Sequence, residues 1–267
     1  MNTNLNNIEK LHKIMAALRD PDTGCPWDQA QDFASIVPHT LEEAYEVAEV
    51  IEVGKMDELC GELGDLLFQV IFYARLAEER GLFDFEQVAG GIVDKLVRRH
   101  PHVFADATVA TVEAQTLAWE ASKAHERAEK MGDVGALAGI AVALPAMTRA
   151  VKLQKRAARV GFDWSDVIPV FDKVREELEE VRVEIAVAGD NTARIEEEIG
   201  DLLFACTNLA RHAQIEPETA LRHANRKFER RFVQMEVMAN AQNRAMSELD
   251  ADAWEVLWEN VKAGESE

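Results

Sequence analysis

The sequence contains no long apolar run and few cysteines, and both absences limit what the chain can be. No stretch approaches the roughly 20 consecutive apolar residues that a membrane-spanning helix needs. The beginning, MNTNLNNIEK, has neither the basic nor the apolar region of a secretory signal. The three cysteines, Cys25, Cys60 and Cys206, form no CxxC pair, which is typical of reduced thiols that pack as small apolar side chains. We therefore expect a cytoplasmic protein with no membrane segment.

Positive charge is also scarce. The chain has 29 Lys and Arg residues against 49 Asp and Glu residues, a formal net charge of −20. Such a surface repels the phosphates of nucleic acids, so we expect no nucleic-acid polymer as a partner. A small anionic ligand stays compatible with this charge if metal ions and a few well-placed cations neutralise it.

Alternating apolar and polar runs, which are typical of β-strands, are rare, whereas apolar residues recur at helical spacing. We therefore predict an all-α fold, a helical bundle. One helix is expected to begin at Thr40, because Pro38 precedes it and Thr40-Leu41-Glu42-Glu43 fits a capping box. Helix ends are predicted at Gly54 and Gly81.

Further along the chain, Asp166 to Pro169 is expected to open a helix, with the proline in the first turn. Asp190-Asn191 predicts a turn between two helices.

A helical unit occurs twice in the sequence. EEAYE at 42–46 matches EELEE at 176–180 with an offset of 134 residues, and ELGDLLF at 62–68 matches EIGDLLF at 198–204 with an offset of 136. The two-residue difference falls in the predicted turn, where insertions are tolerated. We predict an N-terminal domain over 1–121, a linker over 122–145 and a C-terminal domain over 146–267.

Each unit carries two pairs of carboxylates at helical spacing. Residues three apart share a helix face, so an antiparallel hairpin would bring four carboxylates together in each unit: Glu43, Glu46, Glu62 and Asp65, and then Glu177, Glu180, Glu198 and Asp201. Four converging carboxylates repel one another unless a cation lies between them. A ligand set of oxygen atoms alone favours Mg²⁺, with Mn²⁺ as a substitute. The alternative is a solvated acidic helix face, which the ordered recurrence of both pairs disfavours.

The two units differ one helical turn before these carboxylates. Lys173 lies four residues before Glu177, and Arg194 lies four residues before Glu198, whereas the first unit has His39 and Glu58 at these places. Cations beside a metal site suit a polyphosphate ligand. Ordinary salt bridges between residues four apart are the alternative for either cation.

Lys227 and Arg231 lie four residues apart on a later basic helix and could also reach phosphates. A tryptophan at position 258 is usually a packing residue. The alternative, more specific role is stacking on the base of a nucleotide.

Several motifs together resemble the MazG family. Besides the paired carboxylates followed by LLF, they are CPWD at 25–28, RRHPHVF at 98–104, VGFDW at 160–164 and KFERRF at 227–232. The resemblance covers nearly the whole chain. It implies two tandem MazG domains with the all-α nucleoside triphosphate pyrophosphohydrolase fold, a homodimer and Mg²⁺ dependence. It also implies hydrolysis of NTPs and dNTPs to the nucleoside monophosphate and pyrophosphate.

The resemblance further implies that the C-terminal domain carries the activity. Glu177, Glu180, Glu198 and Asp201 are then the catalytic metal ligands. The residues that contact substrate are Lys173, Glu176, Arg194, Glu197, Asp201, Lys227, Arg231 and Trp258. The first domain retains its four carboxylates, so we expect it to bind metal with little or no turnover.

Two alternatives remain from the sequence. One is a pyrophosphatase of the same fold with a narrower choice of nucleotide. The other is a non-catalytic acidic helical scaffold that binds a protein partner, which predicts no metal-dependent turnover of any nucleotide.

Overall fold

The computed structural model describes residues 5–105, 135–187 and 189–265, together with the single positions 111, 115, 118, 119 and 126. The chain divides into two compact units, Met1–Ala124 and His125–Glu267. Half of the predicted linker, namely residues 122–125 and 127–134, lies outside the described residues. The domain boundaries expected from the sequence stay predictions.

The described part of the chain is helical and contains no β-strand, so the all-α prediction is confirmed. The first unit contains α1 (Asn7–Leu18), α2 (Pro26–Ala30), α3 (Phe33–Val53), α4 (Leu59–Glu79), α5 (Phe85–Arg99) and α6 (Pro101–Phe104). The second contains α8 (Ala146–Arg159), α9 (Val167–Ala186), α10 (Thr192–His212), α11 (Pro217–Ala241), the 3₁₀ turn η1 (Met246–Glu248) and α12 (Ala251–Gly264). None of these helices is long and apolar enough to cross a membrane.

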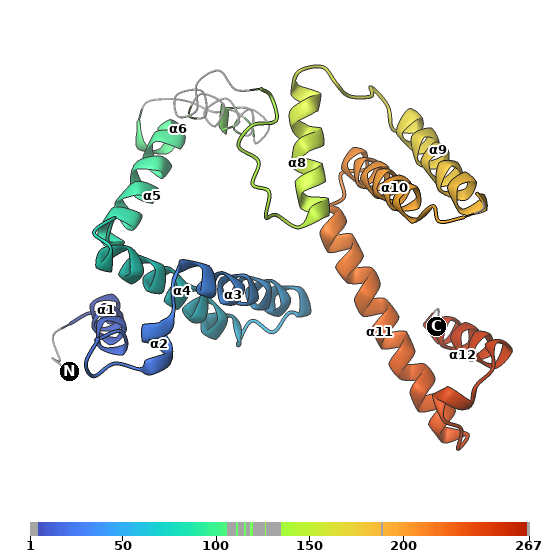
Figure 1. Cartoon of the computed structure of the whole chain (residues 1–267), viewed down its shortest axis with the longest axis horizontal. Helices are drawn as coiled ribbons and strands as arrows, with labels where there is room; N and C mark the ends of the chain where they lie inside the picture. Colours follow the sequence, from blue (N-terminus) through green and yellow to red (C-terminus); the bar gives the residue numbers. More distant parts are fainter. Residues whose placement is uncertain are drawn as a thin grey trace. The chain divides into compact units, whose positions relative to one another are not determined.

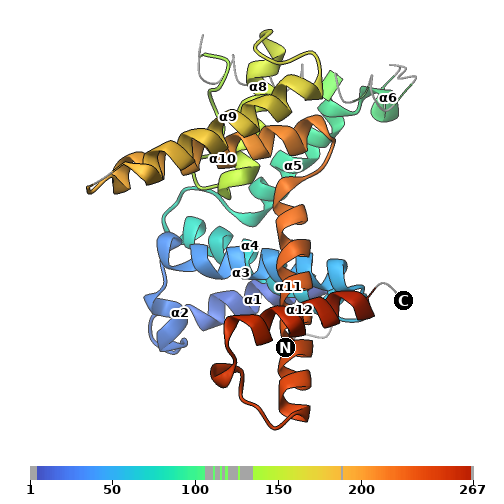
Figure 2. The same ribbon diagram turned by 90° about the vertical axis from the view of Figure 1, so that its right-hand side faces the viewer.

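In each unit two long helices joined by a short turn lie side by side, α3 with α4 and α9 with α10 (Figures 1 and 2). Only five residues separate the end of α3 from the start of α4, and only five separate α9 from α10, so each pair forms an antiparallel hairpin. A shorter helix, α1 or α8, packs against the second helix of the hairpin. This arrangement places the two carboxylate pairs of each unit on facing helices.

The predicted helix start at Thr40 is wrong, because α3 begins at Phe33 and continues through Pro38. Asp32 is the N-cap, and its side chain accepts hydrogen bonds from the backbone N–H groups of Ala34 and Ser35. Thr40 lies inside the helix, where its Oγ1 is 3.2 Å from the carbonyl oxygen of Ile36. A proline near a helix start removes one backbone bond, and the capping box at Asp32 stabilises the start seven residues earlier than Thr40 despite that loss.

The other predicted boundaries are confirmed. Gly54 ends α3 in the left-handed conformation with φ 78°, and Gly81 follows α4 with φ 65°. Asp166 caps α9 by accepting from the backbone N–H of Ile168. Asp190 accepts from Thr192 in the turn before α10.

The buried apolar clusters of the two units lie on different helices. In the first unit Met15, Ile36, Ile71, Phe72 and Leu76 form one core between α1, α3 and α4. In the second unit the corresponding cluster of large buried side chains lies between α11 and α12, formed by Met235, Ala239, Leu257 and Val261. The buried apolar cluster of the second unit thus lies outside its α9–α10 hairpin.

Candidate active site

Three of the four predicted carboxylates of the second unit meet between α9 and α10. Glu177 and Glu180 of α9 and Glu198 of α10 each contribute an oxygen, and these oxygens all lie within 4.8 Å of one another. Asp201, the fourth predicted ligand, lies on α10 three residues after Glu198 but outside this group. Its role as a ligand stays a prediction.

Glu177 is the most buried member, with only 5% of its surface exposed. Its Oε1 lies 2.6 Å from the Lys173 Nζ. Its Oε2 is buried and has no hydrogen-bond partner. A buried carboxylate oxygen without a donor is costly, so this atom is suited to binding a cation.

The charged form of Glu180 is also disfavoured by its surroundings. Loss of hydration and the neighbouring Glu177 carboxylate raise the pKa of Glu180 above its ordinary value. A raised carboxylate pKa means that the charged form is disfavoured at this place, and a bound divalent cation would reverse that.

Two cations flank the cluster at the positions that distinguish the second unit. Lys173 Nζ also lies 2.8 Å from Glu176 Oε1, and its pKa is raised by Glu176 and Glu177. Arg194 lies 2.8 Å from Glu197 and 3.4 Å from Glu198. The salt bridges between residues four apart, Lys173 with Glu177 and Arg194 with Glu198, are therefore present. Contact with a phosphate stays a prediction for both cations.

The first unit repeats the carboxylate cluster without this pairing. Glu43, Glu62 and Asp65 contribute oxygens within 4.8 Å of one another, and Glu46 lies outside the group. Burial and the Asp65 carboxylate raise the pKa of Glu43. His39 lies 3.7 Å from Glu42, and Glu58 pairs with Lys55 at 3.0 Å. His39 and Lys55 thus lie beside carboxylates that are not in the cluster.

The hairpin of α11 and α12 brings together two of the remaining predicted site residues. Arg231 donates to Glu265 over 2.9 and 2.7 Å, and its guanidinium carbon is 5.4 Å from the centroid of the Trp258 ring. Trp258 also packs on Phe228, with ring centroids 5.8 Å apart. Lys227 is exposed on the same helix, α11. Within residues 135–187 and 189–265, no hydrogen bond, ion pair or ring contact joins these side chains to the acidic cluster, so their role in the site stays a prediction.

Glu265 should make a pH-dependent contribution to the stability of this hairpin. Hydrogen bonds from Arg231 and Arg230 lower the pKa of Glu265 from 4.5 to about 2. Because the folded pKa is depressed, the contribution is present above the unfolded pKa and is lost as the pH falls toward 2. We expect Glu265→Gln to lower the melting temperature at pH 7 and to have a smaller effect at pH 3, measured by circular dichroism. An equal difference at both pH values would contradict this assignment.

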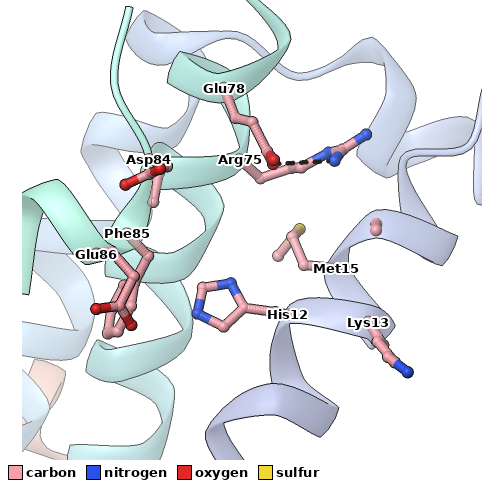
Figure 3. Close-up of a pocket in the computed structure, with 10 residues that line it drawn as sticks. His12, Lys13, Met15, Arg75, Glu78, Asp84, Phe85 and Glu86 are labelled. Carbon is pink, nitrogen blue, oxygen red and sulfur yellow. Dashed lines mark hydrogen bonds and ion pairs between the residues drawn. The ribbon is translucent and has the colours of Figure 1, made fainter.

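Pockets near the hairpins were not visible in the sequence. In the first unit a pocket of about 350 Å³ lies between α1, α4 and the start of α5, with Arg75 paired to Glu78 at its edge (Figure 3). Its lining does not include the acidic cluster. In the second unit a pocket of about 310 Å³ is lined by Leu137, α8, α10 and residues 162–164. The VGFDW motif at 160–164 contributes Phe162, Asp163 and Trp164 to this lining.

Both copies of the repeat match one known domain family. The family model of the MazG nucleotide pyrophosphohydrolase domain matches residues 31–104 and again residues 169–235. These two segments contain the α3–α4 and α9–α10 hairpins or most of their length, including both acidic clusters.

Relatives match over nearly the whole chain. A nucleoside triphosphate pyrophosphohydrolase of Escherichia coli K12 is 51% identical over 261 residues, which cover 98% of this chain and 99% of the relative. The nucleoside triphosphate pyrophosphohydrolase/pyrophosphatase MazG of Thermotoga maritima is 39% identical over 97% of this chain and 96% of its own length. A nucleoside triphosphate pyrophosphohydrolase of Mycobacterium tuberculosis is 34% identical over 70% of this chain and 54% of its own. With its repeated acidic hairpin, the chain belongs to the MazG nucleotide pyrophosphohydrolase family.

Proposed function

We propose that the second unit hydrolyses nucleoside triphosphates, both NTPs and dNTPs, to the monophosphate and pyrophosphate in a Mg²⁺-dependent reaction. The observation that carries this proposal is the buried, unpartnered Oε2 of Glu177 within a cluster of three carboxylates. The names of the E. coli and T. maritima relatives support the same reaction. The first unit is proposed to bind a cation without turning over substrate.

The carboxylate cluster fits a hard divalent cation. Its donors are all oxygens, which is the ligand type that Mg²⁺ and Mn²⁺ prefer. Glu177, Glu180 and Glu198 would hold the cation, and Asp201, three residues after Glu198 on α10, would complete the set. When bound, Mg²⁺ would supply a Lewis acid that neutralises the triphosphate and eases deprotonation of the attacking water.

The residues around the cluster then bind and orient the substrate. Lys173 and Arg194 neutralise phosphate oxygens and stabilise the charge that develops on the departing pyrophosphate. Glu176 and Glu197 hold these two cations at 2.8 Å, which fixes their position before substrate arrives. Attack in line with the leaving pyrophosphate is the geometry that phosphoryl chemistry requires. A carboxylate of the site assists the deprotonation of water.

A homodimer is part of the proposal, because the hairpins expose too much apolar surface for an isolated chain. The large apolar residues that are 41–57% exposed on α9 and α10 include Leu178, Val183, Ile199, Leu203 and Phe204. Extended apolar patches of this kind are typical of protein–protein interfaces, and packing of two hairpins would form a helical bundle. The α11–α12 hairpin is the proposed source of Lys227, Arg231 and Trp258 for the completed site.

The proposed role is removal of surplus or non-canonical nucleotides, or adjustment of nucleotide pools under stress, in the cytoplasm. A panel of NTPs and dNTPs with Mg²⁺ tests the chemistry, with monophosphate and pyrophosphate measured as separate products. We expect pyrophosphate from several nucleotides. Orthophosphate as the first product would contradict the proposed reaction, and no turnover of any nucleotide would favour the protein-binding scaffold.

A further inference from the structure

Glu184 extends the acidic face of α9 by one helical turn. It follows Glu177 by seven residues and Glu180 by four, so the three side chains lie on the same side of the helix. Helices α9 and α10 lie side by side (Figure 1). On α10, Arg194 lies one turn before Glu198, and the antiparallel hairpin therefore places Arg194 across from Glu184. A carboxylate outside the acidic cluster thus meets one of the two cations that flank it.

Asn191 holds the Glu184 side chain in one position. The Asn191 Nδ2 donates to Glu184 Oε2 and also to the backbone carbonyl oxygen of Glu184, over 3.0 Å. One amide group therefore binds both the side chain and the main chain of the same residue. The Glu184 side chain is 21% exposed. A glutamate fixed in this way has already lost much of its rotamer freedom, so the direction of its second oxygen is set by the fold.

That second oxygen faces Arg194. Glu184 Oε1 lies 4.0 Å from Arg194 Nη2, which is too long for a hydrogen bond but within the range of an ion pair. The same Nη2 lies 3.4 Å from Glu198 Oε1, and Nη1 pairs with Glu197 at 2.8 Å. Arg194 Nη2 therefore lies between a residue of the acidic cluster and a carboxylate outside it. If Glu198 binds a cation, its negative charge is neutralised there, and Glu184 is the anion that remains for Nη2.

The first unit has different residues at both of these places. The offset of 134 pairs Glu184 with Val50, which is 6% exposed, and the offset of 136 pairs Arg194 with Glu58. Glu58 pairs with Lys55 at 3.0 Å. A buried valine and a carboxylate thus correspond to the carboxylate and the cation of the second unit. Glu184 and Arg194 therefore differ together between the two repeats, as residues that act as a pair are expected to do.

We propose that Glu184 is a positioning residue that holds Arg194 beside the acidic cluster for binding the triphosphate, an inference that rests on the function proposed above. The guanidinium has five N–H donors in a planar fork. Glu197 and Glu184 hold two of its corners, and the remaining N–H groups bind phosphate oxygens. A cation held in place before the ligand arrives loses less side-chain freedom on binding, and this strengthens the complex.

This role predicts the opposite of a simple charge effect. Glu184→Gln removes a negative charge near a site for an anion, and that change alone would strengthen phosphate binding. The glutamine oxygen still accepts from Asn191, but its amide nitrogen then faces Arg194 Nη2, and two donors repel each other. Arg194 leaves its position as a result. We therefore expect weaker phosphate binding although the site has become less negative.

Calorimetry of the full chain with inorganic tripolyphosphate and Mg²⁺ tests this expectation without turnover. Glu184→Gln should weaken binding about fivefold, which is the size of one partly exposed ion pair. Glu184→Asp keeps the charge but draws the carboxylate back by one methylene, and it should weaken binding to a similar extent. Glu179→Gln is the matched control: it makes the same chemical change on α9 and breaks the ion pair with Arg182, and it should alter binding less than twofold.

Two further measurements separate positioning from a general structural effect. In an Arg194→Gln background, Glu184→Gln should cause no further weakening, because the two residues act through each other. Binding of Mn²⁺ without phosphate should change less than about threefold in Glu184→Gln, since Glu184 lies outside the group of three carboxylates.

Unchanged or tighter tripolyphosphate binding in Glu184→Gln overturns the inference. Equal losses of Mn²⁺ and tripolyphosphate binding also overturn it, as does further weakening in the Arg194→Gln background. If tripolyphosphate does not bind to the unsubstituted protein, the inference is wrong as well. Because these measurements need no hydrolysis, their outcome is distinguishable from that of the nucleotide panel.

Discussion

Replacing Glu177 with Gln is expected to reduce kcat/KM for nucleoside triphosphate hydrolysis by roughly 10²–10³-fold. The amide keeps the size of the side chain but removes its negative charge. In Glu177 the Oε2 of this charged group is buried and has no hydrogen-bond partner. A catalytic cation contributes several kcal/mol to stabilising transition-state charge, and each ~1.4 kcal/mol corresponds to a factor of ten in rate. Steady-state release of pyrophosphate measures the effect.

The matched control is Glu43→Gln, because Glu43 occupies the corresponding place in the repeat. Glu43 also lies in a cluster of three carboxylates, so both substitutions remove similar local repulsion. The first cluster lacks the flanking pairs that Lys173 and Arg194 make in the second, so we expect Glu43→Gln to change kcat/KM by less than about twofold. Equal losses in the two variants would show that the assignment of turnover to the second unit is wrong.

Removing divalent cations is expected to abolish turnover and to lower thermal stability. The three carboxylates of each cluster repel one another, and a bound cation stabilises only the folded arrangement that brings them together. At a cation concentration about 100 times the dissociation constant, binding at one site stabilises the fold by about 2.7 kcal/mol. For a chain of this size that is a rise in melting temperature of roughly 5–10 °C.

Chelation followed by readdition of Mg²⁺ or Mn²⁺ measures both effects on the same sample. Glu177→Gln should lose most of the stabilisation that belongs to the second unit, whereas Glu43→Gln should retain it. Full activity of the chelator-treated protein would contradict a metal-dependent mechanism. Recovery with monovalent salt alone would assign the stabilisation to screening of surface charge instead.

Helical spacing in the sequence was sufficient to predict which carboxylates face one another. Glu177 and Glu180 share a face because they are three residues apart, and the short turn at 187–191 brings α10 back alongside them. The same local rules predicted the ends at Gly54 and Gly81 and the cap at Asp166. They failed at Thr40, because a favourable cap at Asp32 and the contact of Thr40 with Tyr73 outweigh the signal of Pro38. Capping and packing both decide where a helix such as α3 begins. Of the two, only packing depends on residues far along the chain.

By itself, the sequence determined the all-α class, the duplicated hairpin and the acidic residues that converge in it, since each depends on spacing within one helix or one turn. Tertiary structure alone decided that Glu177 Oε2 is buried without a partner and that Asp201 and Glu46 lie outside the closest groups of oxygens. It also decided that Gln154 of α8 meets Phe204 and Asn208 of α10 in an open pocket. Burial and pocket shape depend on how separate helices pack against one another, and residue spacing within a helix does not specify that packing.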